Sequence, residues 1–445
     1  MDAVLYRADR VVTMTSDHPD ADAFVVAGGR VRDVGRVGDV RERWAGRVLE
    51  EELHGVVTPG LIDAHMHMQR AGLKALDYLQ PDDDVDRFIA AMRDSFDDDG
   101  PEHPPFDDRI RALERVQPLL HALGITTVVD PAVTPDEMRG YQVARQRGLL
   151  SMRTVAMPFL ELTTGDADEI DALIARLAGI GAATGFGDDV LSLGGIKVYL
   201  DGEALKGQAW LERPWDGSGY TGLQRIPEDQ YRRLVAWCGT HGWGVGTHAV
   251  GSAAVALAVD AASAAGDAVP DLRFQVIHGY LETPAEAMAQ AARVGVIASV
   301  QPSIIWHNGA GLRAALGERA ERANPLRSWL DSGATVAFGS DGPFFAFDPR
   351  HLMWQAVTRH IAGDDRPLDP AEALTLDEAF AAYTTGAARA AYAEDDRGVI
   401  APGACADWVL WPTDPTAVPI DELRSLSVLR TTVAGRTVYR KDPRA

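Results

Sequence analysis

Two histidines one residue apart are the first indication of chemistry in this chain. They belong to the stretch LIDAHMHMQR, residues 61–70, which follows the apolar run VVTPG. Successive side chains of an extended strand alternate between its faces, so His65 and His67 are expected on the same side, close enough to bind one metal ion. Two ordinary histidines at a strand end would give the same pattern, so the choice depends on the rest of the chain.

Further residues able to bind a metal or move a proton follow other apolar runs. Eight such runs alternate with helix-like, alanine-rich stretches: GLIDAHMHM (60–68), GITTVVDP (124–131), SMRTVAMPF (151–159), GGIKVYL (194–200), GWGVGTHAV (242–250), FQVIHGY (274–280), VGVIASVQP (294–302) and GATVAFGSDGP (333–343). The candidates are His65, His67, Lys197, His248, His278 and Asp341. A single buried histidine is usually a core residue. Here several separate apolar runs would each have to end near such a residue by chance.

These residue types predict metal-assisted hydrolysis. Imidazole nitrogens suit zinc and neighbouring divalent metals, and an aspartate can complete their coordination. Coordination lowers the pKa of water to about 7, which supplies hydroxide at neutral pH. Asp341 beside that water would accept its proton and deliver it to the leaving group.

The apolar runs also predict the fold. Strands that alternate with helices indicate parallel βαβ units, and eight of them predict an α/β protein with a closed (β/α)8 barrel. The C-terminal ends of barrel strands meet on one face, which carries the active site. An open doubly wound sheet is the alternative, but no GxGxxG follows a strand to support it.

The link between the first and second runs, residues 70–123, is long and contains an amphipathic helix candidate, DDVDRFIAAMRDSF (83–96). In a barrel this segment would rise over the active-site face, either as a lid or substrate-selecting element or as a neutral surface insertion.

Both ends of the chain are rich in short strands separated by turn residues. Residues 1–57 resemble a small all-β unit, and residues 398–445 add further short strands around Gly-Arg turns. We expect the two ends to pair into one β-sandwich, with a barrel domain of residues 58–397 between them.

Composition limits the partners. The 445 residues carry 43 basic and 65 acidic side chains, a net charge of −22 that repels nucleic acids and anionic membrane surfaces. The chain opens without a secretion signal and has no run of 18 apolar residues. Its two cysteines, Cys238 and Cys405, form no metal-binding pattern and are expected to be buried. A cytoplasmic protein with a small-molecule substrate, and without nucleic-acid or membrane partners, is expected.

The residues above, in this order, resemble the amidohydrolase superfamily, and within it amidohydrolase family 3, the N-substituted formamide deformylase-like group. The similar segments are VVTPGLIDAHMHM, GGIKVYLDG, GTHAVGSAAVALAVDA, FQVIHGYLETPAEAMAQAARVGVIASVQPS, VAFGSDGPFFAFDPRHLMWQAVTRH, AFAAYTTGAARAA and GVIAPGACADWVLWPTDP. With the opening AFVVAGGRVRDVG they cover nearly the whole chain. The resemblance implies hydrolysis of a C–N bond, in an amide or cyclic amide.

The resemblance also implies roles for single residues. His65 and His67 would bind the more buried metal, His248 and His278 its neighbour, and Asp341 would be ligand and general base. Lys197 matches a lysine that is carboxylated in many relatives with two metals; an unmodified lysine paired with Asp201 is the alternative. One ion or two both stay open. Zinc is expected, with manganese or iron as alternatives, and such barrels often form homodimers.

Five residues are predicted to contact the substrate: Tyr199, Asp201, Gln301, Trp306 and His307. For Trp306 and His307 a surface loop is the alternative. The chain departs from the family's pattern at HAVGS (248–252), where Ser252 takes an acidic place.

Other functions compete with amide hydrolysis. Deamination is disfavoured because Gly251 stands where related deaminases place a glutamate, three residues after His248. Ester or lactone hydrolysis would use the same residues. A non-catalytic scaffold relative is disfavoured because every metal ligand is present.

Overall fold

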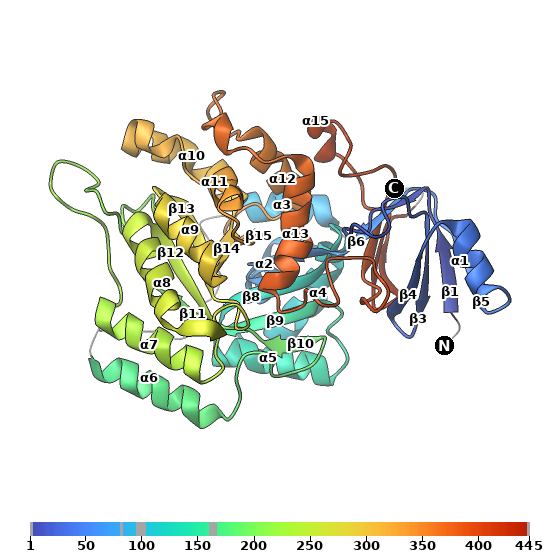
Figure 1. Cartoon of the computed structure of the whole chain (residues 1–445), viewed down its shortest axis with the longest axis horizontal. Helices are drawn as coiled ribbons and strands as arrows, with labels where there is room; N and C mark the ends of the chain where they lie inside the picture. The colour runs from blue at the N-terminus through green and yellow to red at the C-terminus, as the bar shows by residue number, and fades with distance from the viewer. Residues whose placement is uncertain (1–2, 81–82, 95–103, 160–166, 443–445) are drawn as a thin grey trace.

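The computed structural model describes residues 3–80, 83–94, 104–159 and 167–442, and two parallel sheets form its centre (Figure 1). The first sheet has the order β10-β9-β8-β7 and the second the order β11-β12-β13-β14-β15. Their strands are β7 (Leu61–Asp63), β8 (Ile125–Val133), β9 (Arg153–Pro158), β10 (Leu191–Leu193), β11 (Ile196–Tyr199), β12 (Val245–Gly251), β13 (Gln275–Leu281), β14 (Ile297–Val300) and β15 (Val336–Phe338).

Each of the eight predicted apolar runs overlaps one of these strands, and every pairing within the two sheets is parallel. The predicted α/β class with parallel strands is therefore confirmed. The short strand β10 was not predicted, because its three half-buried residues form no apolar run. The longer strands β8, β12 and β13 are buried at every residue, as expected of parallel strands covered on both faces.

The two parallel sheets touch each other at two places. Phe159, which follows β9, forms a parallel bridge with Lys197 of β11. After β7, the Ala64 amide donates to the carbonyl of Phe338 in β15 at 3.0 Å. The segments that carry His65 and Lys197 are therefore both fixed against the neighbouring sheet.

Helices separate the strands along the chain, as the alternation predicts. They are α2 (Met68–Tyr78), α3 (Val85–Asp94), α4 (Phe106–His121), α5 (Pro135–Gln146), α6 (Ala167–Ile180), α7 (Glu228–Thr240), α8 (Ser252–Ala264), α9 (Ala285–Val294), α10 (Pro302–Leu316), α11 (Leu326–Asp331), α12 (Pro349–Thr358), α13 (Leu376–Tyr383), α14 (Thr385–Ala390) and α15 (Ile420–Leu423). Among the described residues, no helix combines the length and apolarity that crossing a bilayer requires.

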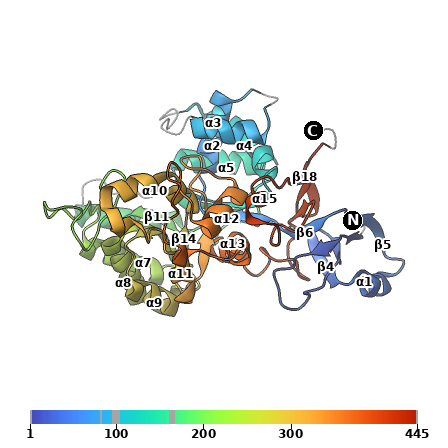
Figure 2. The same ribbon diagram turned by 90° about the horizontal axis from the view of Figure 1, so that it is seen from above.

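The long link after the first strand folds into three helices, α2, α3 and α4, which pack on one another and gather with α5 on one side of the molecule (Figure 2). The amphipathic helix predicted over 83–96 is present as α3, and residues 95–96 lie outside the described residues. A capping box starts α5, because Thr134 and Glu137 satisfy each other's backbone amides.

The two chain ends meet at one end of the molecule, where the blue and red strands lie side by side (Figure 1). One sheet has the order β4-β3-β1-β5 and the other β18-β17-β16-β6-β2. Their strands are β1 (Ala3–Arg7), β2 (Arg10–Val11), β3 (Ala23–Ala27), β4 (Arg30–Gly35), β5 (Val48–Glu52), β6 (Val56–Pro59), β16 (Trp408–Trp411), β17 (Arg430–Val433) and β18 (Arg436–Arg440).

The two sheets share an aromatic core. The Tyr6 and Phe24 rings of the first sheet lie 5.2 and 5.7 Å from the Trp408 ring of the second. The N-terminal segment is not all-β as predicted, since α1 (Val37–Trp44) lies between β4 and β5. This helix packs through Val40 against the outer face of the first sheet. Both cysteines are buried and free, as predicted.

A buried ion pair joins the C-terminal segment to the parallel sheets. At the start of β9, Arg153 donates from Nε to Asp407 Oδ2 at 2.5 Å, and both side chains are almost fully buried. We expect Asp407→Asn to lower the free energy of unfolding by about 3 kcal/mol, because the buried guanidinium loses its main counter-charge. Urea denaturation measures the change.

The exposed pair Arg145–Asp188, with 42% and 46% of its side chains exposed, is the matched control. We expect Asp188→Asn to change the free energy of unfolding by less than about 0.5 kcal/mol. Equal effects of the two substitutions would show that burial adds nothing to the Arg153 pair.

Candidate active site

A cavity of about 890 Å³ gathers most of the predicted site residues. His65 follows β7, Lys197 and Tyr199 lie in β11, His248 in β12 and His278 in β13, and Asp341 follows β15. All six, together with His67, line this cavity. The side chains predicted to meet from separate strands therefore do so, at the face that the sequence predicts.

The segment that carries His65 and His67 is bound to the one that carries Asp341. One oxygen of the Asp63 carboxylate accepts hydrogen bonds from the amides of His65, at 3.1 Å, and Ser340, at 2.9 Å. In return the Asp341 amide donates to the carbonyl of His65 at 2.7 Å. Since β7 ends at Asp63, these bonds place the two histidines, rather than the strand alternation that the sequence predicted.

Backbone segments at the site approach each other closely, and two of the site residues have unusual φ angles. A Cβ atom at Gly339 would lie 2.5 Å from the Cβ and N atoms of His65, so only glycine allows the two segments to approach this closely. His278 and Asp341 have φ angles of 81° and 57°, in the left-handed region that non-glycine residues rarely occupy. Such strain is typical of functional sites, where the surrounding structure imposes it.

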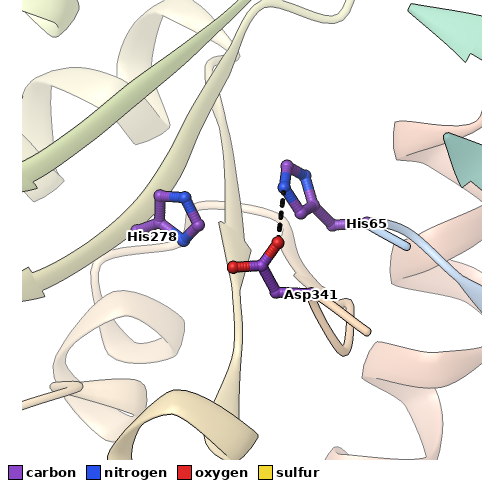
Figure 3. A group of neighbouring side chains, drawn as sticks. All are labelled: His65, His278 and Asp341. Atoms are coloured by element: carbon purple, nitrogen blue, oxygen red, sulfur yellow. Dashed lines mark ion pairs between the residues drawn. The ribbon is translucent and has the colours of Figure 1, made fainter. Parts of the chain in front are cut away.

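The Asp341 carboxylate lies between imidazole rings (Figure 3). Its Oδ1 is 3.5 Å from His65 Nε2 and 3.4 Å from His67 Nε2. Ligand atoms of His65, His278 and Asp341 all lie within 4.8 Å of one another. The His248 ring completes the cluster, with its centroid 4.5 Å from that of His278.

Gln301 fixes the orientation of His278. The Gln301 amide donates from Nε2 to the Ser299 carbonyl at 3.1 Å, so its Oε1 accepts the hydrogen bond from His278 Nδ1 at 2.7 Å. The proton of this imidazole is therefore on Nδ1, and the lone pair of Nε2 is available to a ligand. Gln301 was predicted to contact substrate; its side chain instead orients His278.

Three imidazole nitrogens of the cluster make no hydrogen bond among the described residues. They are Nδ1 of His65, Nδ1 of His67 and Nε2 of His248. The nearest carboxylates lie 3.9 Å from His67 Nδ1, at Asp130, and 3.6 Å from His248 Nε2, at Asp201. Buried polar atoms normally have hydrogen-bond partners. Four imidazoles gathered beside a carboxylate have the chemistry of a site for a divalent metal, and the residues therefore fit one.

The electrostatics of the cluster agree with this chemistry. Burial lowers the pKa of all four histidines, to about 4 for His278, and so keeps them in the neutral form that binds metals. Burial raises the pKa of Asp341, but the hydrogen bonds from His65 and His67 outweigh it and hold this pKa well below its usual value. Burial also lowers the pKa of Lys197 to about 7.

Asp201 does not line the cavity, although it was predicted to contact substrate. Its carboxylate is fully buried and accepts the amides of Val250 and Gly251 at 2.9 and 2.8 Å. No ion pair between Lys197 and Asp201 exists in the described part of the chain, which does not support the alternative that pairs them. Asp201 thus supports the end of β12, beside His248.

Trp306 and His307 also lie outside the cavity lining, and they belong to α10 rather than to a loop. The Trp306 ring packs edge-on against His351, with centroids 4.6 Å apart, and His307 is exposed. Asn308, which the sequence places with them after the seventh run as able to contact substrate, does line the cavity, together with Ile304. Of the five predicted substrate contacts, only Tyr199 lines the cavity.

Three cationic residues of the lining were not predicted: Arg70 and Lys74 of α2 and Arg109 of α4. Arg70 stands only three residues after His67, one helical turn away, so its position carried a signal. Arg109 lies more than 40 residues after His67, and only the packing of α4 on α2 brings it to the cavity.

Comparison with known proteins yields one family. The model described as "Amidohydrolase family" matches residues 86–439. The chain is 30% identical over 358 residues to Protein LONG AFTER FAR-RED 3 of Arabidopsis thaliana, a match that covers 75% of this chain and 58% of that protein. It is 27% identical over 348 residues to N-substituted formamide deformylase of Arthrobacter pascens, covering 74% of this chain and 61% of that protein.

The chain thus spans about three-fifths of the length of these two relatives. Among solved structures, an uncharacterised metal-dependent hydrolase from Pyrococcus furiosus superposes with a TM-score of 0.73 at 20% identity. The superposition covers 93% of this chain and all of the other, and it shows that the two share a fold.

Proposed function

Since the chain belongs to the amidohydrolase family, we propose that it is a metal-dependent hydrolase that cleaves the C–N bond of an amide or cyclic amide in a small molecule. One observation carries this proposal: four buried, neutral imidazoles and the Asp341 carboxylate converge on one cavity, and three of the imidazole nitrogens make no hydrogen bond among the described residues. The shared fold with a metal-dependent hydrolase is consistent with it.

His65, His67, His248, His278 and Asp341 would hold the metal, with Lys197 beside them. When bound there, a divalent metal acidifies water and polarises the carbonyl under attack. Asp341 accepts the proton of the attacking water and then donates it to the leaving nitrogen. Gln301 holds His278 in the required tautomer, and the Tyr199 ring forms part of the wall that orients the substrate.

Deamination fits less well. A Cβ atom at Gly251 would lie 2.2 Å from the Trp210 carbonyl oxygen, so no glutamate side chain is accommodated at that position.

The finer features of the fold are part of the proposal. A closed (β/α)8 barrel over residues 58–397 is favoured by the contacts between the parallel sheets at Phe159–Lys197 and Ala64–Phe338. A β-sandwich of residues 1–57 and 398–445 is favoured by the core that the two outer sheets share. Zinc as the metal, carboxylation of Lys197, a homodimer, a cytoplasmic location and the absence of nucleic-acid and membrane partners stay predictions.

Metal analysis together with an amide screen tests the function. We expect the purified protein to hold about one to two equivalents of zinc, manganese or iron, as the ligand set predicts. Removal of the metal by a chelator should abolish amide hydrolysis, and added metal should restore it. Full turnover by metal-free protein, or no amide turnover by metal-loaded protein, would contradict the proposal.

A further inference from the structure

One wall of the cavity is cationic, although the chain as a whole carries a net charge of −22. This wall is formed by α2 and α4, which pack against each other (Figure 2). It presents Arg70 and Lys74, one helical turn apart on α2, and Arg109 of α4. Guanidinium groups in a cavity lining are suited to bind an anion.

Arg109 is buried, and no counter-charge for it is found among the described residues. Only 8% of the residue is exposed, and its Nη1 donates to the Gln69 side-chain oxygen at 3.0 Å. Gln69 in turn donates from Nε2 to the Glu137 carbonyl at 3.2 Å, which fixes its oxygen toward Arg109. Within the described residues no carboxylate pairs with this guanidinium. A buried charge is unfavourable unless it is paired, so Arg109 has an unused capacity to bind an anion from the cavity.

Hydrogen bonds fix the position of Arg70, the second arginine of this wall. Its Nε donates to Glu137 Oε1 at 3.2 Å, while Glu137 Oε2 accepts the amide and the hydroxyl of Thr134 at 2.8 and 2.9 Å. Glu137 therefore fixes Arg70, and both of its carboxylate oxygens already accept hydrogen bonds. One-third of the Arg70 side chain is exposed. Arg70 lines the same cavity as His67, which it follows by three residues.

Apart from Glu137, no acidic group of the lining pairs with Arg70 or Arg109 in the described part of the chain. Lys206 and Glu203 pair with each other at 2.9 Å, and each side chain is 63% exposed at the cavity mouth. Asp136 is exposed as well, and Asp341 faces His65 and His67.

We propose that Arg109 and Arg70 bind a compact oxyanion of the substrate, a carboxylate or a phosphate, close to the bond that is hydrolysed. The planar guanidinium fork matches both anions through paired hydrogen bonds. This inference rests on the proposed function, because it names the class of substrate that the same cavity accepts.

Calorimetric titration of the metal-loaded, full-length protein tests the inference with ligands that it cannot hydrolyse. The probes are phenylbutyrate, phenylpropylphosphonate and a neutral methyl ketone of the same length. We expect wild type to bind one or both anions at least about tenfold more tightly than the ketone, and the preferred anion identifies the natural group. Arg109→Met and Arg70→Met should each weaken anion binding about 10- to 100-fold and leave ketone binding unchanged.

Arg111→Met is the matched control. Arg111 lies on the same helix, but its side chain is 65% exposed and pairs with Asp108 at 2.7 Å, so anion binding should not change. Circular dichroism establishes that each variant is folded, and the partly exposed Arg70 provides a test that does not remove a buried side chain.

Equal affinity of wild type for anions and ketone would overturn the inference. So would anion binding that survives both Arg109→Met and Arg70→Met, because the metal alone would then hold the anion. The proposed function can fail independently of this inference. If the protein hydrolysed no amide but still preferred anions in a way that depended on both arginines, the anion site would be supported and amide hydrolysis would not.

Discussion

Asp341→Asn is expected to lower kcat for amide hydrolysis by about 100- to 10,000-fold, the usual contribution of a general base. Asparagine has nearly the same shape, and the backbone bond from residue 341 to the His65 carbonyl, 2.7 Å long, does not involve the side chain. The fold should therefore survive, while the negative charge and the proton acceptor beside His65 and His67 are lost. Steady-state kinetics at saturating metal measures the effect.

Metal content must be measured in the same variant, because Asp341 is also a proposed ligand. A variant that holds its metal and loses turnover supports the role of Asp341 as base. The control is Asp136→Asn, at an exposed acid that lines the same cavity. We expect that substitution to change kcat less than about threefold, since surface substitutions have small effects. Retained turnover in Asp341→Asn would refute the assigned base.

The metal-competent residues could be predicted because each follows or lies within a strongly apolar run. Such a run is buried whichever helices cover it, and parallel strands bring their C-terminal ends to one face. His65, Lys197, His248, His278 and Asp341 thus converge without any knowledge of the loops. His65 reaches the cavity although it lies beyond the strand, because its amide and that of Ser340 donate to the Asp63 carboxylate.

The predicted substrate contacts failed where the chain leaves its strand. Because β11 ends at Tyr199, strand alternation relates Lys197 to Tyr199 but does not apply to Asp201. After β14 the chain turns into α10, so Trp306 and His307 lie on a helix and not in a loop. On a helix, residues four apart share a face, so Ile304 and Asn308 line the cavity and the residues between them do not.

The role of Arg109 could not be predicted from spacing. No carboxylate pairs with Arg109 among the described residues, and only the three-dimensional structure shows which groups lie near it. In the sequence it stands beside the acidic residues Asp107 and Asp108, which suggest an ordinary solvated helix start. In the structure Asp108 instead pairs with the exposed Arg111.

The second large effect is expected for His65→Ala, which should weaken metal binding about 100- to 1,000-fold. Structural zinc sites with four ligands bind with about 10–16 kcal/mol, so one ligand contributes roughly 3–4 kcal/mol. His65 is 1% exposed, has one ring nitrogen near Asp341 and has the other buried without a partner, so its ring has no other described role. Titration with zinc against a competing chelator measures the affinity.

Loss of a buried ring also lowers stability, and His121→Ala separates the two effects. His121 is equally buried, but its Nδ1 donates to the Ile125 carbonyl at 2.9 Å and its Nε2 lies 3.0 Å from Ser151 Oγ, away from the cavity lining. Both variants should unfold at lower urea concentration, whereas only His65→Ala should bind metal more weakly. If both variants lost metal to the same degree, general destabilisation would explain the result. If His65→Ala bound metal with unchanged affinity, His65 would not be a metal ligand. A selective loss therefore ties metal binding to the imidazole cluster, because His121 is as buried as His65 but lies away from the cavity lining.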